Sequence, residues 1–137
     1  MTQKKNVSLQ HVMLWVLQVA VAAVMLMAAF MKLAEPISRL AASYPWMGQA
    51  SPLFVRFMGA VDLLGALGLL LPGILRIRPA LTAWTAAAIV LLMICAIIFH
   101  VSRGEGAVTG FNIAVALMAA VIAWGRFRTT PATRPAG

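Results

Sequence analysis

The sequence contains four apolar runs, and each is long enough to cross a lipid bilayer as a helix. An α-helix rises about 1.5 Å per residue, so the roughly 30 Å hydrocarbon core of a membrane takes about 20 residues. The runs cover residues 12–33, 53–71, 80–101 and 109–125. They show no period-two alternation, and lipid cannot satisfy an open sheet edge, which argues against strands. The sequence therefore predicts an all-α membrane protein, a bundle of four transmembrane helices that forms one domain over residues 1–126.

The ends of these runs carry the signals that mark helix ends. Pro52 and Pro72 bracket the second run, and prolines at helix ends mark where the backbone turns. The first run resembles a signal peptide but is much longer than a secretory h-region, so we expect an uncleaved signal anchor. The tail after Arg126 is polar and contains proline. We therefore expect residues 127–137 to form a disordered cytoplasmic tail.

Composition narrows the possible partners and cofactors. With 63% apolar and 10% charged residues, the chain is unlike a soluble domain and has the lipid bilayer as its first partner. The net charge of +8 does not indicate nucleic acid, because the Lys and Arg residues flank the apolar runs, where they meet lipid head groups. Cys95 is the single cysteine, which excludes an intrachain disulfide, a thiol relay and a cysteine zinc site. No metal site is expected.

Basic residues at the ends of the runs predict the orientation in the membrane. The side shared by the N-terminus, the loop between the second and third runs and the C-terminus carries Lys4, Lys5, Arg76, Arg78, Arg126, Arg128 and Arg134. The opposite loops, residues 34–52 and 102–108, hold only Arg39 and Arg103 together with two glutamates. Since an excess of Lys and Arg stays cytoplasmic, both termini are predicted to lie inside.

Asp62 is the most informative residue of the chain. It lies nine residues after Leu53, which corresponds to about 14 Å of helix and places it near the middle of the bilayer. A carboxylate there costs about 2.5 to 3.5 kcal/mol unless it faces the bundle, a cavity or a partner charge. The candidate helix-packing residues around it are small, namely Gly59, Gly65, Ala66 and Gly68. We therefore expect the helix at 53–71 to be central and Asp62 to face inward.

Other polar residues lie near the predicted outer ends of the helices, one from each. They are Lys32, Arg56, His100 and Asn112. Two interpretations remain open for these residues and for Asp62. In the first, the charged side chains reach the outer head groups and Asp62 makes a structural ion pair or hydrogen bond within the bundle. In the second, these residues together form a ligand or proton site.

The helical rise argues against a direct pair between Lys32 and Asp62. Lys32 is predicted near the membrane boundary and Asp62 some 10 to 12 Å deeper, which one side chain barely spans. Arg56 is rotated by about 120° from Asp62 around the same helix. We therefore predict a polar vestibule open to the outside, with Arg56 and His100 at its mouth and Asp62 at its floor.

The first helix carries a second, weaker pattern. His11, Gln18, Met25 and Lys32 recur every seven residues and fall on one stripe. Interface anchoring by the two end residues, with Gln18 bonded to a neighbouring helix, is favoured over a functional role for this stripe.

Three segments of the sequence resemble the DoxX-like membrane family. They are Phe30-x-Lys32-Leu33, Gly59-x-x-Asp62-x-x-Gly65-Ala66-Leu67-Gly68-Leu69-x-x-Pro72 and Ala96-x-x-x-His100. The resemblance implies a four-helix bundle in a bacterial inner (cytoplasmic) membrane, with the family's polar positions at Lys32, Asp62 and His100. Relatives often carry Glu where this chain has Asp62, so the family's geometry does not transfer directly to this shorter side chain.

The same resemblance implies a role beside a redox enzyme, because the family takes its name from a small subunit of a thiosulfate and quinone oxidoreductase. The leading hypothesis is an accessory subunit or partner of a quinone-linked system, with quinone as a non-covalent ligand and a redox protein as partner. Two alternatives stay open. One is a small proton-coupled transporter that acts as a homo-oligomer, specifically a dimer, and the other is a membrane scaffold or assembly factor without catalysis.

Overall fold

The computed structural model describes the backbone of residues 2–129 and the side chains of residues 9–129. Its elements are α1 (Thr2–Ala34), α2 (Ile37–Ser43), α3 (Pro45–Gln49), α4 (Pro52–Leu75), α5 (Ala80–Ser102), a short 3-10 helix η1 (Gly106–Val108) and α6 (Thr109–Thr129). Four segments are long and apolar enough to span a membrane: Leu9–Ala34, Pro52–Leu75, Ala80–Ser102 and Gly106–Thr129. The described residues contain no strand. The prediction of an all-α protein with four transmembrane helices is confirmed.

Three helices extend clearly further than their apolar runs suggest, and α1 begins at Thr2, ten residues before its run. α4 continues through Pro72 to Leu75, because this proline lies in the last turn, where its carbonyl oxygen accepts the backbone N–H groups of Arg76 and Ile77. α6 continues to Thr129. Residues 127–129, expected to be part of the disordered tail, are therefore helical, and residues 130–137, like the side chains of Lys4 and Lys5, lie outside the described part of the chain.

The segment between α1 and α4 is helical, which sequence analysis did not predict. Pro36 precedes α2 and Pro45 is the first residue of α3, and proline is favoured at the start of a helix because its missing N–H group is not needed there. The two short helices bury Leu40 and Met47 against Val55 of α4. They form a separate small hydrophobic cluster at one end of the bundle.

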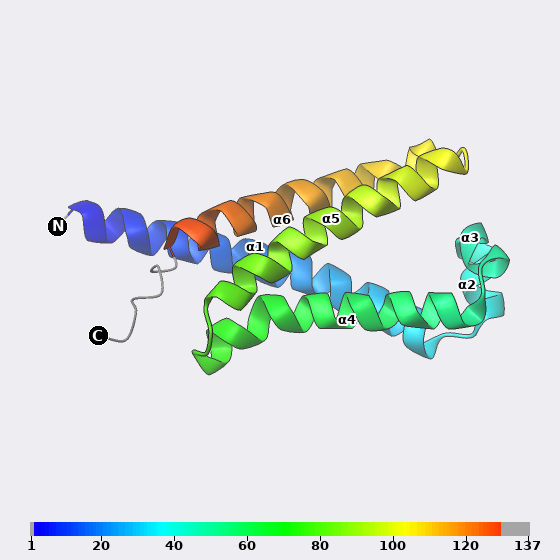
Figure 1. Cartoon of the computed structure of the whole chain (residues 1–137), viewed down its shortest axis with the longest axis horizontal. Coiled ribbons are helices and arrows are strands. Elements are labelled where there is room, and N and C mark those ends of the chain that lie inside the picture. The colour runs from blue at the N-terminus through cyan, green and yellow to red at the C-terminus, as the bar shows by residue number, and fades with distance from the viewer. Residues whose placement is uncertain (1, 130–137) are drawn as a thin grey trace.

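The four long helices pack in a ring. α1 contacts α4, α4 contacts α5, α5 contacts α6, and α6 returns to α1. The expectation of a central helix at 53–71 is therefore wrong, since α4 packs mainly on two neighbours and leaves Leu53 and Leu64 exposed. Figure 1 shows that α1 begins and α6 ends at the same end of the bundle, as an even number of spans requires.

Glycines decide where neighbouring helices come closest. A side chain added at Gly65 would collide with Met25 of α1, and one added at Gly68 would collide with Thr85 of α5. Gly125 of α6 lies in the same way against Leu14 of α1. We call the end of the bundle with these close contacts the closed end. From there the α1–α4 pair and the α5–α6 pair separate toward the end that carries α2 and α3 (Figure 1).

Candidate functional site

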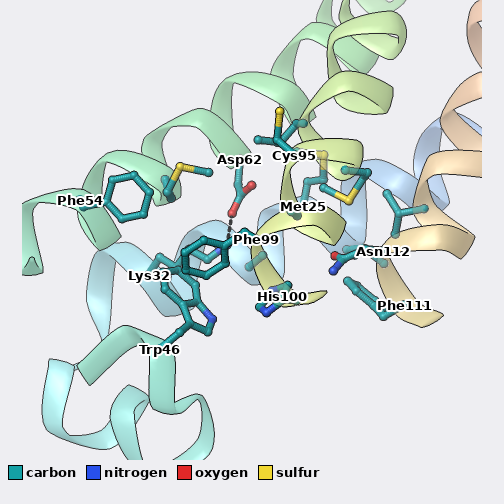
Figure 2. Close-up of a pocket in the computed structure, with 17 residues that line it drawn as sticks. Met25, Lys32, Trp46, Phe54, Asp62, Cys95, Phe99, His100, Phe111 and Asn112 are labelled. Carbon is teal, nitrogen blue, oxygen red and sulfur yellow. Dashed lines mark hydrogen bonds and ion pairs between the residues drawn. The ribbon is translucent and has the colours of Figure 1, made fainter. Parts of the chain in front are cut away.

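A cavity of about 380 Å³ lies in the half of the bundle where the two helix pairs separate. Its lining comes from α1, α3, α4, α5 and α6 (Figure 2). The polar lining residues are Lys32, Asp62, His100 and Asn112. The structure thus brings four of the five candidate ligand or proton residues to one space, and it leaves Arg56 outside.

Lys32 and Asp62 form a direct ion pair, contrary to the sequence-based argument. The Lys32 Nζ lies 2.6 Å from the Asp62 Oδ2, and the two side chains are only 16% and 6% exposed. The depth estimate failed because it placed the ends of the two helices level. In the structure the Cβ of Lys32 lies against Gly59, which is three residues, or about 4.5 Å of helix, from Asp62.

Arg56 stabilises the end of α1 and is not at the mouth of the cavity. Its guanidinium donates hydrogen bonds to the backbone oxygens of Lys32 and Glu35 at 2.6 and 2.8 Å. These carbonyls lie at the C-terminus of α1, where helical partners are missing and a positive charge is favourable. Arg56 therefore holds the backbone of Lys32 in place. The same contacts show that α4 begins beyond the end of α1.

His100 lies at the end of α5 and is tied to the following loop. Its Nδ1 is 2.8 Å from the Glu105 Oε2, and since an ionised carboxylate only accepts hydrogen bonds, Nδ1 carries the hydrogen. Arg103 bonds to the other Glu105 oxygen and reaches Gln49 of α3. The hydrogen bond from His100, assisted by the Arg103 guanidinium, holds the pKa of Glu105 below its ordinary value of 4.5.

Aromatic side chains make up much of the remaining lining. They are Trp46, Phe54, Phe99 and Phe111. Trp46 packs edge-on against Phe99 and His100, with ring centroids 5.7 and 6.4 Å apart. Sequence analysis missed Trp46 because it lies in a segment expected to be a loop, where no helical spacing related it to His100. Figure 2 shows Trp46 and His100 on the same side of the cavity.

Three polar groups at the cavity have unused hydrogen-bonding capacity. Among the residues that the structure describes, none bonds to Asp62 Oδ1, to His100 Nε2 or to the side-chain amide of Asn112. Asn112 is 9% exposed. None of these atoms is among the fully buried polar atoms that lack a partner, so each keeps some contact with open space. These groups can therefore bind a polar ligand without breaking a bond within the protein.

The first-helix stripe divides between the two ends of the bundle. Met25 and Lys32 line the cavity, whereas Gln18 bonds to the backbone oxygen of Leu69 and to Arg126 near the closed end. His11 lies within hydrogen-bonding distance of Arg126 as well. Fully buried apolar residues separate the two polar regions, among them Val21, Ala22, Ala66 and Leu69.

The small residues of α4 lie at its contacts with other helices. Gly59 touches α1, Gly65 touches α1 and lies near Ile89 of α5, Gly68 touches α5, and Ala66 is fully buried in the core. Asp62 lies among them and is buried. Across the part of the chain that is described, no three His, Cys, Asp or Glu side chains come together in a way that could hold a metal ion.

Comparison with known proteins adds a family to this geometry. A sequence profile of the DoxX-like family matches residues 16–122, which takes in Lys32, Asp62, His100 and Asn112. The chain belongs to the DoxX-like family. No curated protein and no solved structure matches it. The family and the four apolar helices together make this a DoxX-like multi-pass membrane protein, and the predicted resemblance to the DoxX-like family is confirmed.

Proposed function

We propose that this DoxX-like protein is the small membrane subunit or partner of a quinone-linked redox system and binds the quinone head group in the cavity. The proposal rests on three groups that have no bonding partner among the described residues, namely Asp62 Oδ1, His100 Nε2 and the Asn112 amide. They line a space of about 380 Å³, which falls in the roughly 300 to 1,000 Å³ range of small-molecule sites. Aromatic walls with a few polar groups suit a flat ring that bears two oxygens.

The polar groups differ in what they can do for such a ligand. The Asn112 amide donates two hydrogen bonds, and the Lys32 ammonium has two N–H groups beyond the one it gives to Asp62. Both can donate to carbonyl oxygens and fix the ring orientation. Asp62 Oδ1 accepts a hydrogen bond, as does His100 Nε2 when the ring carries its single hydrogen on Nδ1, so these atoms suit the hydroxyl groups of the reduced ligand and can take up its protons.

Electrons in this proposal come from a partner. A bound quinone supplies two-electron redox chemistry, but the only cysteine of the chain is Cys95, so the chain has no thiol pair with which to exchange electrons. We therefore include a redox partner protein, for which the DoxX-like chain provides the membrane site. The proposal keeps the predicted inner-membrane location with both termini inside, which places the cavity toward the exterior.

Native co-purification tests the proposal most directly. The protein is extracted from its own membranes in mild detergent, and the bound lipids and co-purifying proteins are identified by mass spectrometry. We expect a quinone and a dehydrogenase or other redox protein. A ligand-free homodimer that moves protons with a substrate in liposomes would replace the proposal with the transporter alternative.

A variant of Asn112 separates ligand binding from folding. Asn112→Leu removes the amide at similar volume, and since that amide has no partner among the described residues, we expect unchanged or higher thermal stability. Affinity for a decyl benzoquinone in nanodiscs should fall about tenfold, as expected for losing one or two hydrogen bonds. Thr82→Val is the matched control, because Thr82 is buried and polar but does not line the cavity.

The outcome of that test also addresses the scaffold alternative. Unchanged quinone affinity in Asn112→Leu, with unchanged assembly, would favour a purely structural cluster. The transporter alternative has less support at present, because the apolar core between Asp62 and Gln18 interrupts any polar path along the bundle. Proton movement through that core would need a rearrangement of the helices.

A further inference from the structure

Two rows of apolar side chains face each other where α4 and α5 separate. On α4, Met58 and Phe54 lie one and two turns before Asp62, and on α5, Cys95 and Phe99 lie one turn apart. All of them line the cavity. Neither row contains a polar side chain beyond Asp62 itself. The cavity therefore has an apolar extension between these two helices, which begins at Asp62.

The spacing of small residues explains why the helices separate there. Gly65 and Gly68 let α4 approach Ile89 and Thr85 of α5 closely at the closed end, as small residues do between membrane helices. Beyond Asp62 the inward positions of α4 are occupied by the large side chains of Met58 and Phe54. Close approach is no longer possible, and the two helices diverge.

This extension reaches the lipid-facing surface. Phe54 is 45% exposed and Phe99 37%, and Cys95 is exposed as well. In Figure 2, Cys95 lies between the ribbons of α4 and α5. The opposite gap, between α1 and α6, is lined by the buried Asn112 and Val115, whereas Phe111 at the start of α6 is 60% exposed.

The end of the cavity near α2 and α3 is covered. Trp46 of α3 packs against Phe54, Phe99 and His100. Arg103 of the loop after α5 bonds to Gln49 of α3 and so joins the two sides of this end. A ligand that arrives from the bilayer meets fewer obstacles than one that arrives from water.

We propose that the cavity opens sideways to the lipid between α4 and α5, and that its ligand is an amphiphile whose apolar tail lies along this gap. The head group lies against Asp62 and Asn112, and the tail passes Cys95 and Phe99 into the acyl chains. Burial of tail methylene groups against these side chains adds affinity that the head group alone does not have. The inference rests on the proposed function, in which the amphiphile is a quinone with an alkyl or isoprenoid chain.

The test blocks the gap and compares ligands with and without a tail. The probes are a decyl-substituted benzoquinone and the same head group with a methyl group in place of the chain. Cys95→Ala in nanodiscs is the reference, which also removes the one thiol that could react with the ring. We expect Cys95→Trp to lower the affinity for the decyl compound about tenfold and to affect the methyl compound much less.

Two further variants control for position. Ile94→Trp, in the Cys95→Ala background, places the same bulk at the neighbouring lipid-facing position of α5, which is 46% exposed and does not line the cavity. It should leave both affinities unchanged. Ala28→Trp, in the same background, narrows the gap between α1 and α6. It should leave the difference in affinity between the decyl and the methyl compound unchanged.

A measurement on the unmodified chain guards against misfolding of the variants. Alkylation of Cys95 by N-ethylmaleimide in vesicles should slow several-fold with the decyl compound and little with the methyl compound. Loss of tail-dependent affinity in Ala28→Trp but not in Cys95→Trp, or equal protection of Cys95 by both probes, would overturn the lateral opening and leave the quinone site standing. Absence of binding of either probe to the reference protein would instead overturn the proposed function.

Discussion

The two halves of the bundle use the same four helices in different ways. In the closed half, glycines and fully buried apolar side chains bring the helices together, as at Gly68 against Thr85 and around Leu69 and Ile122. In the open half, large side chains keep α4 and α5 apart, and polar groups face the space between them. Asp62 marks the boundary along α4.

The comparison shows how a membrane protein can hold a rigid core and a polar cavity within one short bundle. Lipid supplies little hydrophobic drive between helices, so close packing at small residues has to provide the contacts that hold them together. Where those residues end, the helices are free to separate. In the open half α1 and α4 stay in contact through the close approach at Gly59, the ion pair between Lys32 and Asp62 and the hydrogen bonds of Arg56.

The largest expected effect comes from breaking the ion pair of the open half. Lys32→Met leaves the Asp62 carboxylate without its partner, and removing one member of a buried pair typically costs about 3 to 5 kcal/mol. We expect a large fall in thermal stability in detergent, measured by size-exclusion fluorescence. The double variant Lys32→Met with Asp62→Leu should recover most of that loss. Equal stability of Lys32→Met and the wild type would show that the pair does not hold α1 to α4.

A smaller effect is expected from crowding the closed half. Gly68→Leu forces side-chain atoms into Thr85 of α5, and overpacking of this kind costs about 1 to 3 kcal/mol. Thermal unfolding in nanodiscs measures it. The matched control is Gly110→Leu on α6, since a side chain there meets nothing within 4 Å. If both variants unfold at the same temperature, the closed half is not held by close approach at Gly68.

The smallest expected effect is a loss of thermal stability at acidic pH, caused by the loop that follows α5 beside the open half. Because the pKa of Glu105 is lowered in the folded protein, its contacts with His100 and Arg103 contribute stability above the ordinary value of 4.5 that is lost as the pH falls below it. We expect the Tm to decline by about 1 °C more in the wild type than in Glu105→Gln between neutral and acidic pH. Parallel pH profiles of the two proteins would show that this contact adds nothing.

The candidate site was only partly predictable. Asp62 stood out because a carboxylate far inside an apolar run is costly, and Lys32, His100 and Asn112 stood out as polar residues near helix ends. The sequence predicts that these residues share one cavity with Arg56, but Arg56 does not line it. The sequence also argues against a direct ion pair between Lys32 and Asp62, which the structure contains. Both errors have one cause, because counting residues along each helix gives no information about the vertical offset between helices.

Trp46 and the helices α2 and α3 illustrate a second limit. Short segments of seven and five residues are not stable helices alone, because helix nucleation is unfavourable and few hydrogen bonds follow it. They form here because Leu40 and Met47 pack against Val55 of α4. That contact is not visible in the local sequence.

The sequence by itself determined that the chain is a membrane protein of four helices, because hydropathy and length are properties of each segment and the bilayer acts on each segment separately. It also indicated that Asp62 must be sheltered. Only the tertiary structure decided which partner shelters it, how far α4 extends beyond α1, and where α4 and α5 separate. Those features depend on contacts between helices, whose offsets and close approaches are set jointly by the side chains of both partners.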